Sequence, residues 1–123
     1  PFFTDSLKTP DKARNMARHN DTLQVSELVE ITSKLLTDRG KAAFIIPFDA
    51  FKNWISIASG FSLFPARAAR VKSSPQHAAH RMMIVFTRER NPDLNIDEII
   101  IYSSKNIYTD HYRDLTKDFY LNF

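Results

Sequence analysis

The stretch Lys41-Ala42-Ala43-Phe44-Ile45-Ile46 is a short and almost continuous apolar run. A run of apolar residues without alternation is typical of a strand that is buried on both faces of a sheet. Such a strand requires parallel neighbours and helices that cover it. The run therefore predicts a protein of the α/β class.

Amphipathic segments lie on both sides of this run. Apolar side chains recur every three or four residues before it, which predicts a helix over 25–36 that Gly40 stops. After it, we expect Asp49 to cap a second helix over 51–58, and Gly60 to end that helix. The two apolar stripes consist of Val25, Leu28, Val29, Thr32, Leu35 and Leu36, and of Phe51, Trp54, Ile55 and Ala58.

The pattern changes after Gly60, where strands and turns follow one another. The remaining predicted elements are strands over 63–73, 81–88 and 98–102, loops over 73–77 and 91–93, and a short helix over 110–116 with Thr109 as its cap. The order helix, strand, helix and then three strands predicts an α/β sheet whose last strands turn antiparallel.

Residues 1–22 show no apolar period, and they predict a polar loop with at most a short turn of helix over 11–18. Lys8, Arg14, Arg18 and His19 lie in this segment. A polar loop of this length is uncommon in a compact domain unless it binds something, although a solvated connection is the alternative.

The predicted sheet is incomplete, because nothing before residue 25 supplies a parallel neighbour for the buried strand. We interpret 1–123 as a single partial domain, in which 1–22 is a substrate-side loop and 23–123 carries the regular elements. The chain does not begin with methionine, which indicates a processed product or a part of something longer. A half-sheet exposes an edge and an apolar face, which would permit self-association.

Composition excludes several classes of protein. The sequence has only two glycines, Gly40 and Gly60. A P-loop or a G-x-G-x-x-G loop needs two or three glycines within a few residues, so neither loop can occur in these 123 residues. The absence of cysteine excludes disulfides, thiolate nucleophiles and Cys-type metal sites, and it fits a reducing cytoplasm. No run reaches the roughly 18 apolar residues of a membrane span, and no signal peptide is visible. A net charge of +3 permits an anionic partner without requiring one.

Catalytic and metal-binding motifs are weak. His77 and His80 are three residues apart without a nearby carboxylate, so solvated or phosphate-facing histidines are favoured over a metal site. No serine lies in a G-x-S-x-G elbow, and the acidic residues are too scattered to predict a carboxylate pair.

The segment 66–90 holds six basic side chains, Arg81 among them, against Glu89 alone. Phosphate contact and a solvated strand edge explain it equally well.

A resemblance to a known family sharpens these alternatives. Pro1-Phe2-Phe3 looks like the end of the N-P-P-[FY]-F motif of amino-methyltransferases. More specific stretches resemble bacterial tRNA1(Val) (adenine-37-N6)-methyltransferases along essentially the whole chain. They are Ser6-Leu7-Lys8, Arg14, Ala17-Arg18-His19, Leu35-Leu36, Gly40, Ile46-Pro47-Phe48, Arg81-Met82, Tyr108-Thr109 and Leu115-Thr116-Lys117-Asp118-Phe119-Tyr120-Leu121.

The resemblance implies the C-terminal half of a Rossmann-like class I methyltransferase sheet with an antiparallel final hairpin. Such enzymes use S-adenosyl-L-methionine, whose main binding loop would lie upstream of Pro1. No cofactor-binding residue is therefore expected in this chain, which should be inactive alone. The implied reaction is methylation of an adenine N6 in a tRNA anticodon loop, in the cytoplasm, without a metal or a membrane.

The resemblance also implies roles for individual residues. Phe2 would stack on the flipped adenine, and Pro1 is the second proline of the motif. The residues expected to contact RNA are Lys8, Arg14, Arg18, His19 and Arg81. Two alternatives stay open: a methyltransferase of the same fold that acts on DNA adenine or a protein glutamine, and a basic RNA-binding module without chemistry of its own.

Overall fold

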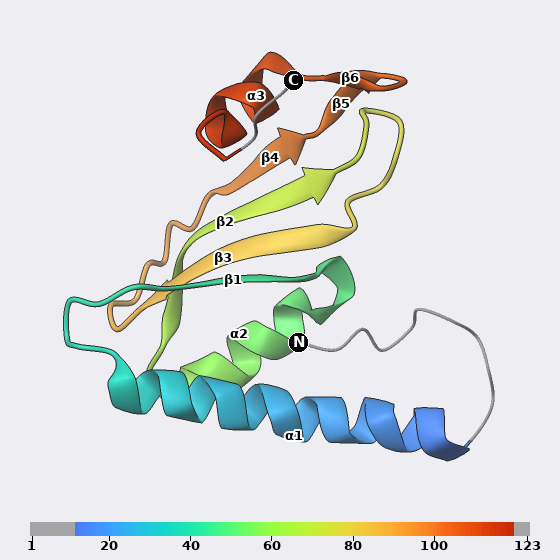
Figure 1. Cartoon of the computed structure of the whole chain (residues 1–123). Helices are drawn as coiled ribbons and strands as arrows, with labels where there is room; N and C mark the ends of the chain where they lie inside the picture. The colour runs from blue at the N-terminus through green and yellow to red at the C-terminus, as the bar shows by residue number, and fades with distance from the viewer. Residues whose placement is uncertain (1–11, 120–123) are drawn as a thin grey trace.

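The structure is a computed structural model that describes the backbone of residues 12–119 and the side chains of residues 24–119. In chain order the elements are α1 (Lys12–Leu35), β1 (Ala42–Pro47), the 3-10 turn η1 (Phe48–Ala50), α2 (Phe51–Ser59), β2 (Phe64–Lys72), β3 (Arg81–Thr87), β4 (Ile96–Ile100), β5 (Tyr102–Ser104), β6 (Ile107–Tyr108) and α3 (Asp110–Thr116) (Figure 1).

Four of these strands form one sheet in the order β1-β3-β2-β4. Strand β3 runs antiparallel to both β1 and β2, while β4 runs parallel to β2. It follows that β1, β2 and β4 point the same way and that their carboxyl ends share one edge of the sheet. We call this edge the carboxyl edge. The predicted α/β class and the antiparallel hairpin β2–β3 are confirmed.

One face of the sheet is packed against α1 and α2, which lie below it in Figure 1. The core consists of Val29, Ile46, Trp54, Ala58, Leu63, Ala68, Met82, Ile84 and Phe86. Phe44 joins the layers, since its ring lies 4.9 Å from that of Trp54 and 6.1 Å from that of Phe86. Each large side chain buried here contributes about 1.5–3 kcal/mol. The predicted apolar stripes of both helices face this core, except that Leu35, at the end of α1, is 79% exposed.

The other face of the sheet is left open by the described helices. Ile45 and Met83, which are neighbours in the β1–β3 register, are 60% and 39% exposed on it. Within residues 12–119, β1 also pairs only with β3. The prediction that 41–46 is buried on both faces is thus wrong for the described part of the chain. An apolar run indicates that both faces of a strand can be buried. It does not show that residues 12–119 supply the elements that cover both faces.

Helix α1 begins at Lys12, so the predicted loop over 1–22 is wrong for residues 12–22. No proline or glycine occurs between Pro10 and Gly40, and extending a formed helix costs far less than starting one. A helix that is polar all round has no apolar period by which sequence analysis could detect it. Residues 1–11 lie outside the described residues.

Two of the predicted helix boundaries are also corrected. Helix α1 ends at Leu35, and Gly40 lies beyond it in a turn where its amide N–H donates to the Thr37 carbonyl oxygen over 3.0 Å. Asp49 lies inside η1, and α2 has no side-chain cap. Gly60 does end α2, as predicted.

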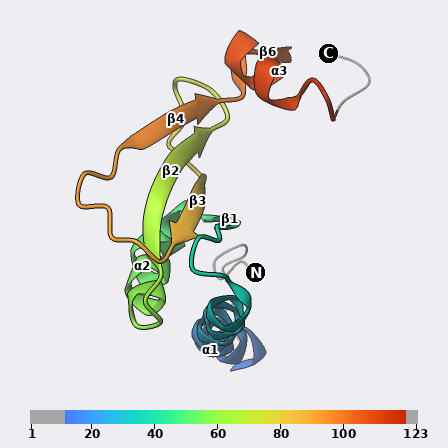
Figure 2. The same ribbon diagram turned by 90° about the vertical axis from the view of Figure 1, so that its left-hand side faces the viewer.

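The C-terminal unit, residues 101–119, lies at the far end of the sheet from α1 (Figure 2). The predicted strand over 98–102 is divided into β4 and β5, and the hairpin β5–β6 was not predicted because its strands are too short to show a period. Thr109 caps α3 as predicted. Its hydroxyl accepts a hydrogen bond from the Tyr112 amide over 3.1 Å and donates one to the Ile100 carbonyl oxygen over 2.5 Å.

Candidate nucleic-acid interface

Backbone hydrogen bonds gather four segments at the carboxyl edge. The Phe48 amide donates to the His80 carbonyl oxygen over 3.1 Å, and the His80 amide donates to that of Val71 over 3.0 Å. The Tyr102 amide donates to the Ser73 carbonyl oxygen over 2.8 Å. The loop 73–80, which joins β2 to β3, therefore lies at the end of the sheet where β1 ends. In open α/β sheets this is the edge that binds ligands.

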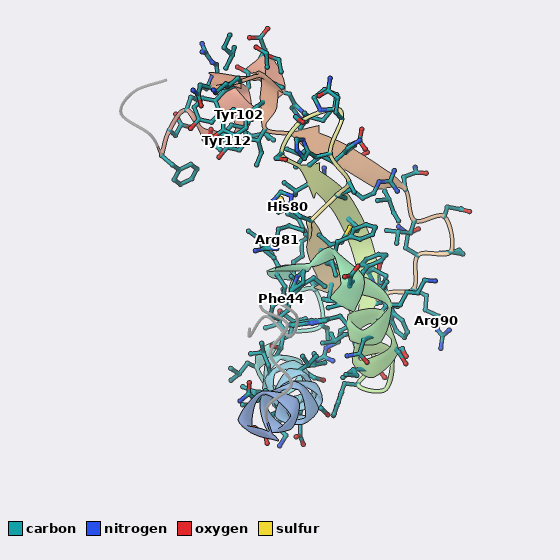
Figure 3. All side chains as sticks on the ribbon, turned by 90° about the vertical axis from the view of Figure 1, so that its right-hand side faces the viewer. Phe44, His80, Arg81, Arg90, Tyr102 and Tyr112 are labelled. Atoms are coloured by element: carbon teal, nitrogen blue, oxygen red, sulfur yellow. The ribbon has the colours of Figure 1, made fainter. Side chains whose placement is uncertain are left out.

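Arg81 is the predicted RNA-binding residue that the structure brings to the carboxyl edge. It opens β3, and its register partners are Pro47 and Val71. These three residues alternate with the buried Ile46 and Met82, so they share the open face of the sheet. The Arg81 guanidinium donates to the His80 carbonyl oxygen over 3.0 Å. Figure 3 shows His80 and Arg81 between the C-terminal unit and Phe44.

The loop 73–80 carries two exposed histidines. The Ser74 hydroxyl and His77 Nδ1 are hydrogen-bonded, and the His77 amide donates to the Ser74 carbonyl oxygen over 3.2 Å, which folds the loop back on itself. Within residues 12–119, no group of three or more His, Asp or Glu side chains could hold a metal ion.

The sequence between Ala50 and Arg88 is basic without any acidic residue. This stretch includes β2, β3 and the loop between them. Lys72 lies 3.7 Å from the Glu98 carboxylate, so its charge is partly compensated from β4. Arg88 does not belong to the carboxyl edge, because β3 carries it to the opposite end, where it bonds main-chain oxygens of Ser33 and Leu36. The basic segment 66–90 is therefore not one surface, since Arg81 lies at the carboxyl edge while Arg88 and Arg90 lie at the opposite end of β3.

The other predicted RNA-binding residues are placed only in part. Arg14, Arg18 and His19 belong to the first half of α1 and not to a loop, and only their backbone is described. That half of α1 points to the same side of the molecule as the carboxyl edge (Figure 1). Pro1, Phe2 and Lys8 lie outside the described residues, and their roles stay predictions.

An open basin of about 550 Å³ lies at the opposite edge of the sheet. Arg39, Lys41 and Arg90 line it together with Asp38 and Glu89, so charges of both signs meet there. The Arg90 guanidinium lies 4.7 Å from the centre of the Phe64 ring. Because this basin surrounds the start of β1 and the end of β3, it is separate from the carboxyl edge.

The fold has a counterpart among solved structures. A predicted O-methyltransferase from Agrobacterium tumefaciens superposes with a TM-score of 0.60 at 14% sequence identity, over 76% of this chain and 45% of that one. The α/β sheet with its antiparallel hairpin is therefore half of a Rossmann-like methyltransferase fold. No protein-family model matches the sequence.

Curated relatives match almost the whole chain. Proteins from Flavobacterium johnsoniae, Bacteroides fragilis and Flavobacterium psychrophilum are 38%, 40% and 33% identical over 98% of it. All three are named tRNA1(Val) (adenine(37)-N6)-methyltransferase. The chain spans about half of their length, 51–52%. The chain therefore matches one part of proteins that carry this name, which confirms the resemblance seen in its sequence.

Methyltransferase relatives imply a methyl donor, and the described residues do not fit a cradle for one. Gly40 and Gly60 are isolated, and each precedes a strand at the edge opposite the carboxyl edge. No glycine-rich turn links a strand to a helix within residues 12–119. In the same range, no helix is long and apolar enough to cross a membrane.

Proposed function

We propose that this chain is the RNA-side part of an S-adenosyl-L-methionine-dependent methyltransferase that modifies N6 of an adenine in a tRNA anticodon loop. The observation that carries the proposal is the match of 98% of the chain to relatives named for this reaction. The basic stretch from Ala50 to Arg88, which contributes Arg81 to the carboxyl edge and holds no acidic residue, supports it, because cations attract a polyanion.

In this proposal the work is divided between two parts of a longer protein. The donor, which supplies a methyl group bound to a positively charged sulfur, is held mainly by residues upstream of Pro1. This chain contributes Pro1 and Phe2 beside the target base, and cations that hold the flanking backbone. The 123 residues alone should therefore be inactive. Because tRNA is the substrate, the protein works in the cytoplasm.

The chemistry explains why positioning is the main task of these residues. The lone pair of an adenine amino group is delocalised into the ring, so N6 is a poor nucleophile until it is oriented. A base that is flipped out of its stack and held on an aromatic ring has few other orientations, and Phe2 would provide that ring. Arg81 would neutralise a phosphate beside the flipped nucleotide, and polar groups of the loop 73–80 would contact the same backbone.

The test uses the complete gene product that carries this chain, with labelled S-adenosyl-L-methionine. Three acceptors are compared: tRNA, duplex DNA that contains adenine, and a glutamine peptide. We expect N6-methyladenosine in the tRNA alone, and no product when the target adenine is replaced by guanine. Methylation of DNA or peptide in preference to tRNA would support the other methyltransferases. Tight tRNA binding without transfer to any acceptor would support the RNA-binding module.

A further inference from the structure

Three tyrosines of the C-terminal unit form a continuous stack, which we call the tyrosine column. The ring centres of Tyr102 and Tyr108 are 4.9 Å apart, with 21° between the ring planes. Those of Tyr108 and Tyr112 are 5.3 Å apart, with 20° between the planes. Tyr108 is thus covered on both faces by tyrosine, and among the described residues Tyr102 and Tyr112 are the first and last rings of the column.

The column is fixed beside the carboxyl edge. The Tyr102 amide is bonded to Ser73, at the start of the loop 73–80, and the Thr109 amide donates to the Ile101 carbonyl oxygen over 2.8 Å. The Thr109 cap then holds the first turn of α3, which carries Tyr112. In Figure 3, which views the carboxyl edge, Tyr102 and Tyr112 lie at one end of the surface that continues to His80 and Arg81.

The tyrosine column differs from the aromatic contacts of the core. Phe44 meets Trp54 and Phe86 at interplanar angles of 52° and 62°, the tilted and edge-on arrangements typical of a filled interior. The column is nearly parallel, its three rings are only half-buried, and α3 has no buried residue. A parallel stack with partly exposed rings is the arrangement that a nucleobase can extend.

We propose that the tyrosine column is a stacking platform for unpaired bases of the RNA that reaches the carboxyl edge. This inference rests on the proposed function. The C-terminal unit itself is electrically balanced, since Lys105, Arg113 and Lys117 face the same number of acidic residues, Asp110, Asp114 and Asp118. The electrostatic attraction for phosphates therefore comes from Arg81, while the column adds base stacking, which depends little on salt.

This division of roles gives a test in the complete gene product, with tRNA affinity measured over a series of salt concentrations. We expect Tyr112→Leu to weaken tRNA binding roughly 5- to 100-fold. The slope of the logarithm of the association constant against the logarithm of the salt concentration should stay unchanged. Tyr112→Phe keeps an aromatic ring and should stay within about twofold of the wild type. Arg81→Gln should instead make this negative slope less steep by roughly 0.7–0.9. Arg90→Gln, at the edge opposite the carboxyl edge, should leave the slope unchanged.

A second measurement needs no variant and remains valid if Tyr112→Leu unfolds α3. An anticodon stem-loop with 5-iodouridine in its unpaired positions is irradiated on the wild-type protein, and the attached residue is identified by mass spectrometry. Iodouridine reacts with aromatic rings on which it stacks. We expect attachment to Tyr102 or Tyr112 and none to Tyr108. Attachment confined to residues outside the column would overturn the inference.

The remaining outcomes separate this inference from the proposed function. If the wild-type protein binds no tRNA, both fail. If it binds and methylates tRNA and Tyr112→Leu does so equally well, only the platform is wrong. If Tyr112→Leu and Tyr112→Phe lose the same amount of tRNA affinity and both unfold at a lower temperature, the role of the column is purely structural. A dimer that Tyr112→Leu abolishes, at unchanged tRNA affinity, would make it a protein contact. Each of these results contradicts the platform.

Discussion

The Arg88 guanidinium donates a hydrogen bond over 2.8 Å to the carbonyl oxygen of Leu36, immediately after the end of α1. It also bonds the carbonyl oxygen of Ser33, so a half-buried cation at the end of β3 serves two carbonyl groups that the helix leaves without partners. A positive charge is favourable at a helix C-terminus. Arg88 therefore joins α1 to the sheet and is not available to RNA.

We expect Arg88→Met to lower the free energy of unfolding of the complete gene product by about 1–3 kcal/mol, because two partly buried carbonyl oxygens lose their donor. Urea-induced unfolding measures the change. The exposed Lys52 provides a matched control, and Lys52→Met should stay within about 0.5 kcal/mol. Affinity for tRNA should be equal in both variants at a temperature where both are folded. A loss of affinity in Arg88→Met without a loss of stability would contradict the structural role.

Thr109 connects the C-terminal unit to the sheet through its side chain. Thr109→Ala removes both the cap of α3 and the bond to Ile100, and we expect it to cost about 0.5–2 kcal/mol. Hydrogen exchange should become faster over 110–116 and stay unchanged over β3. Thr109→Ser keeps the hydroxyl and is the control, with wild-type exchange expected. Unchanged exchange in Thr109→Ala would show that the cap does not hold α3.

The open face of the sheet predicts self-association of the isolated 123-residue chain. Ile45 and Met83 present adjacent apolar side chains there, and β1 lacks a described second neighbour. Light scattering during gel filtration should show a mass that rises with protein concentration. Ile45→Lys places a charge in this patch and should shift the chain towards the monomer. Glu89→Lys, which lies in the basin away from the patch, should not change the mass. A wild-type chain that stays monomeric at every concentration would refute the prediction.

Phe2 lies outside the described residues, and its role comes from the resemblance. If Phe2 stacks on the flipped adenine, Phe2→Ala in the complete gene product should lose about 1–3 kcal/mol of base-binding energy. The dissociation constant of S-adenosyl-L-methionine, measured by calorimetry, should hardly change. An equal loss of donor affinity would identify Phe2 as a structural residue instead. A lower unfolding temperature with a proportional loss of activity would point to an ordinary core position.

Elements with a strong apolar pattern were predictable from the sequence. The run 41–46 became β1, the stripe over 51–58 became α2, and Thr109 and Gly60 lie at the helix ends where they were expected. The first half of α1 was missed because a helix without an apolar face leaves no periodic signal. The open face of β1 was missed because the pattern shows what a strand can bury and not what covers it.

The candidate site was predictable only at the level of residue type. Arg81 was singled out as a cation, but its position beside Pro47 depends on the strand order β1-β3-β2, which no local pattern specifies. The same order brings the loop 73–80 to the carboxyl edge. The tyrosine column had no sequence signal, because no single helical or strand period joins Tyr102, Tyr108 and Tyr112. The short hairpin and the turn at Asn106, with φ of 62°, bring them together.

The proposed reaction is tested most directly in the source organism, by nucleoside mass spectrometry of purified tRNA from the wild type and from a strain without this gene. We expect one anticodon-loop adenosine to lose its N6-methyl group in the deletion strain, and to regain it with the complete gene but not with a copy that carries Phe2→Ala. An unchanged level of N6-methyladenosine in every tRNA of the deletion strain would contradict the proposed function.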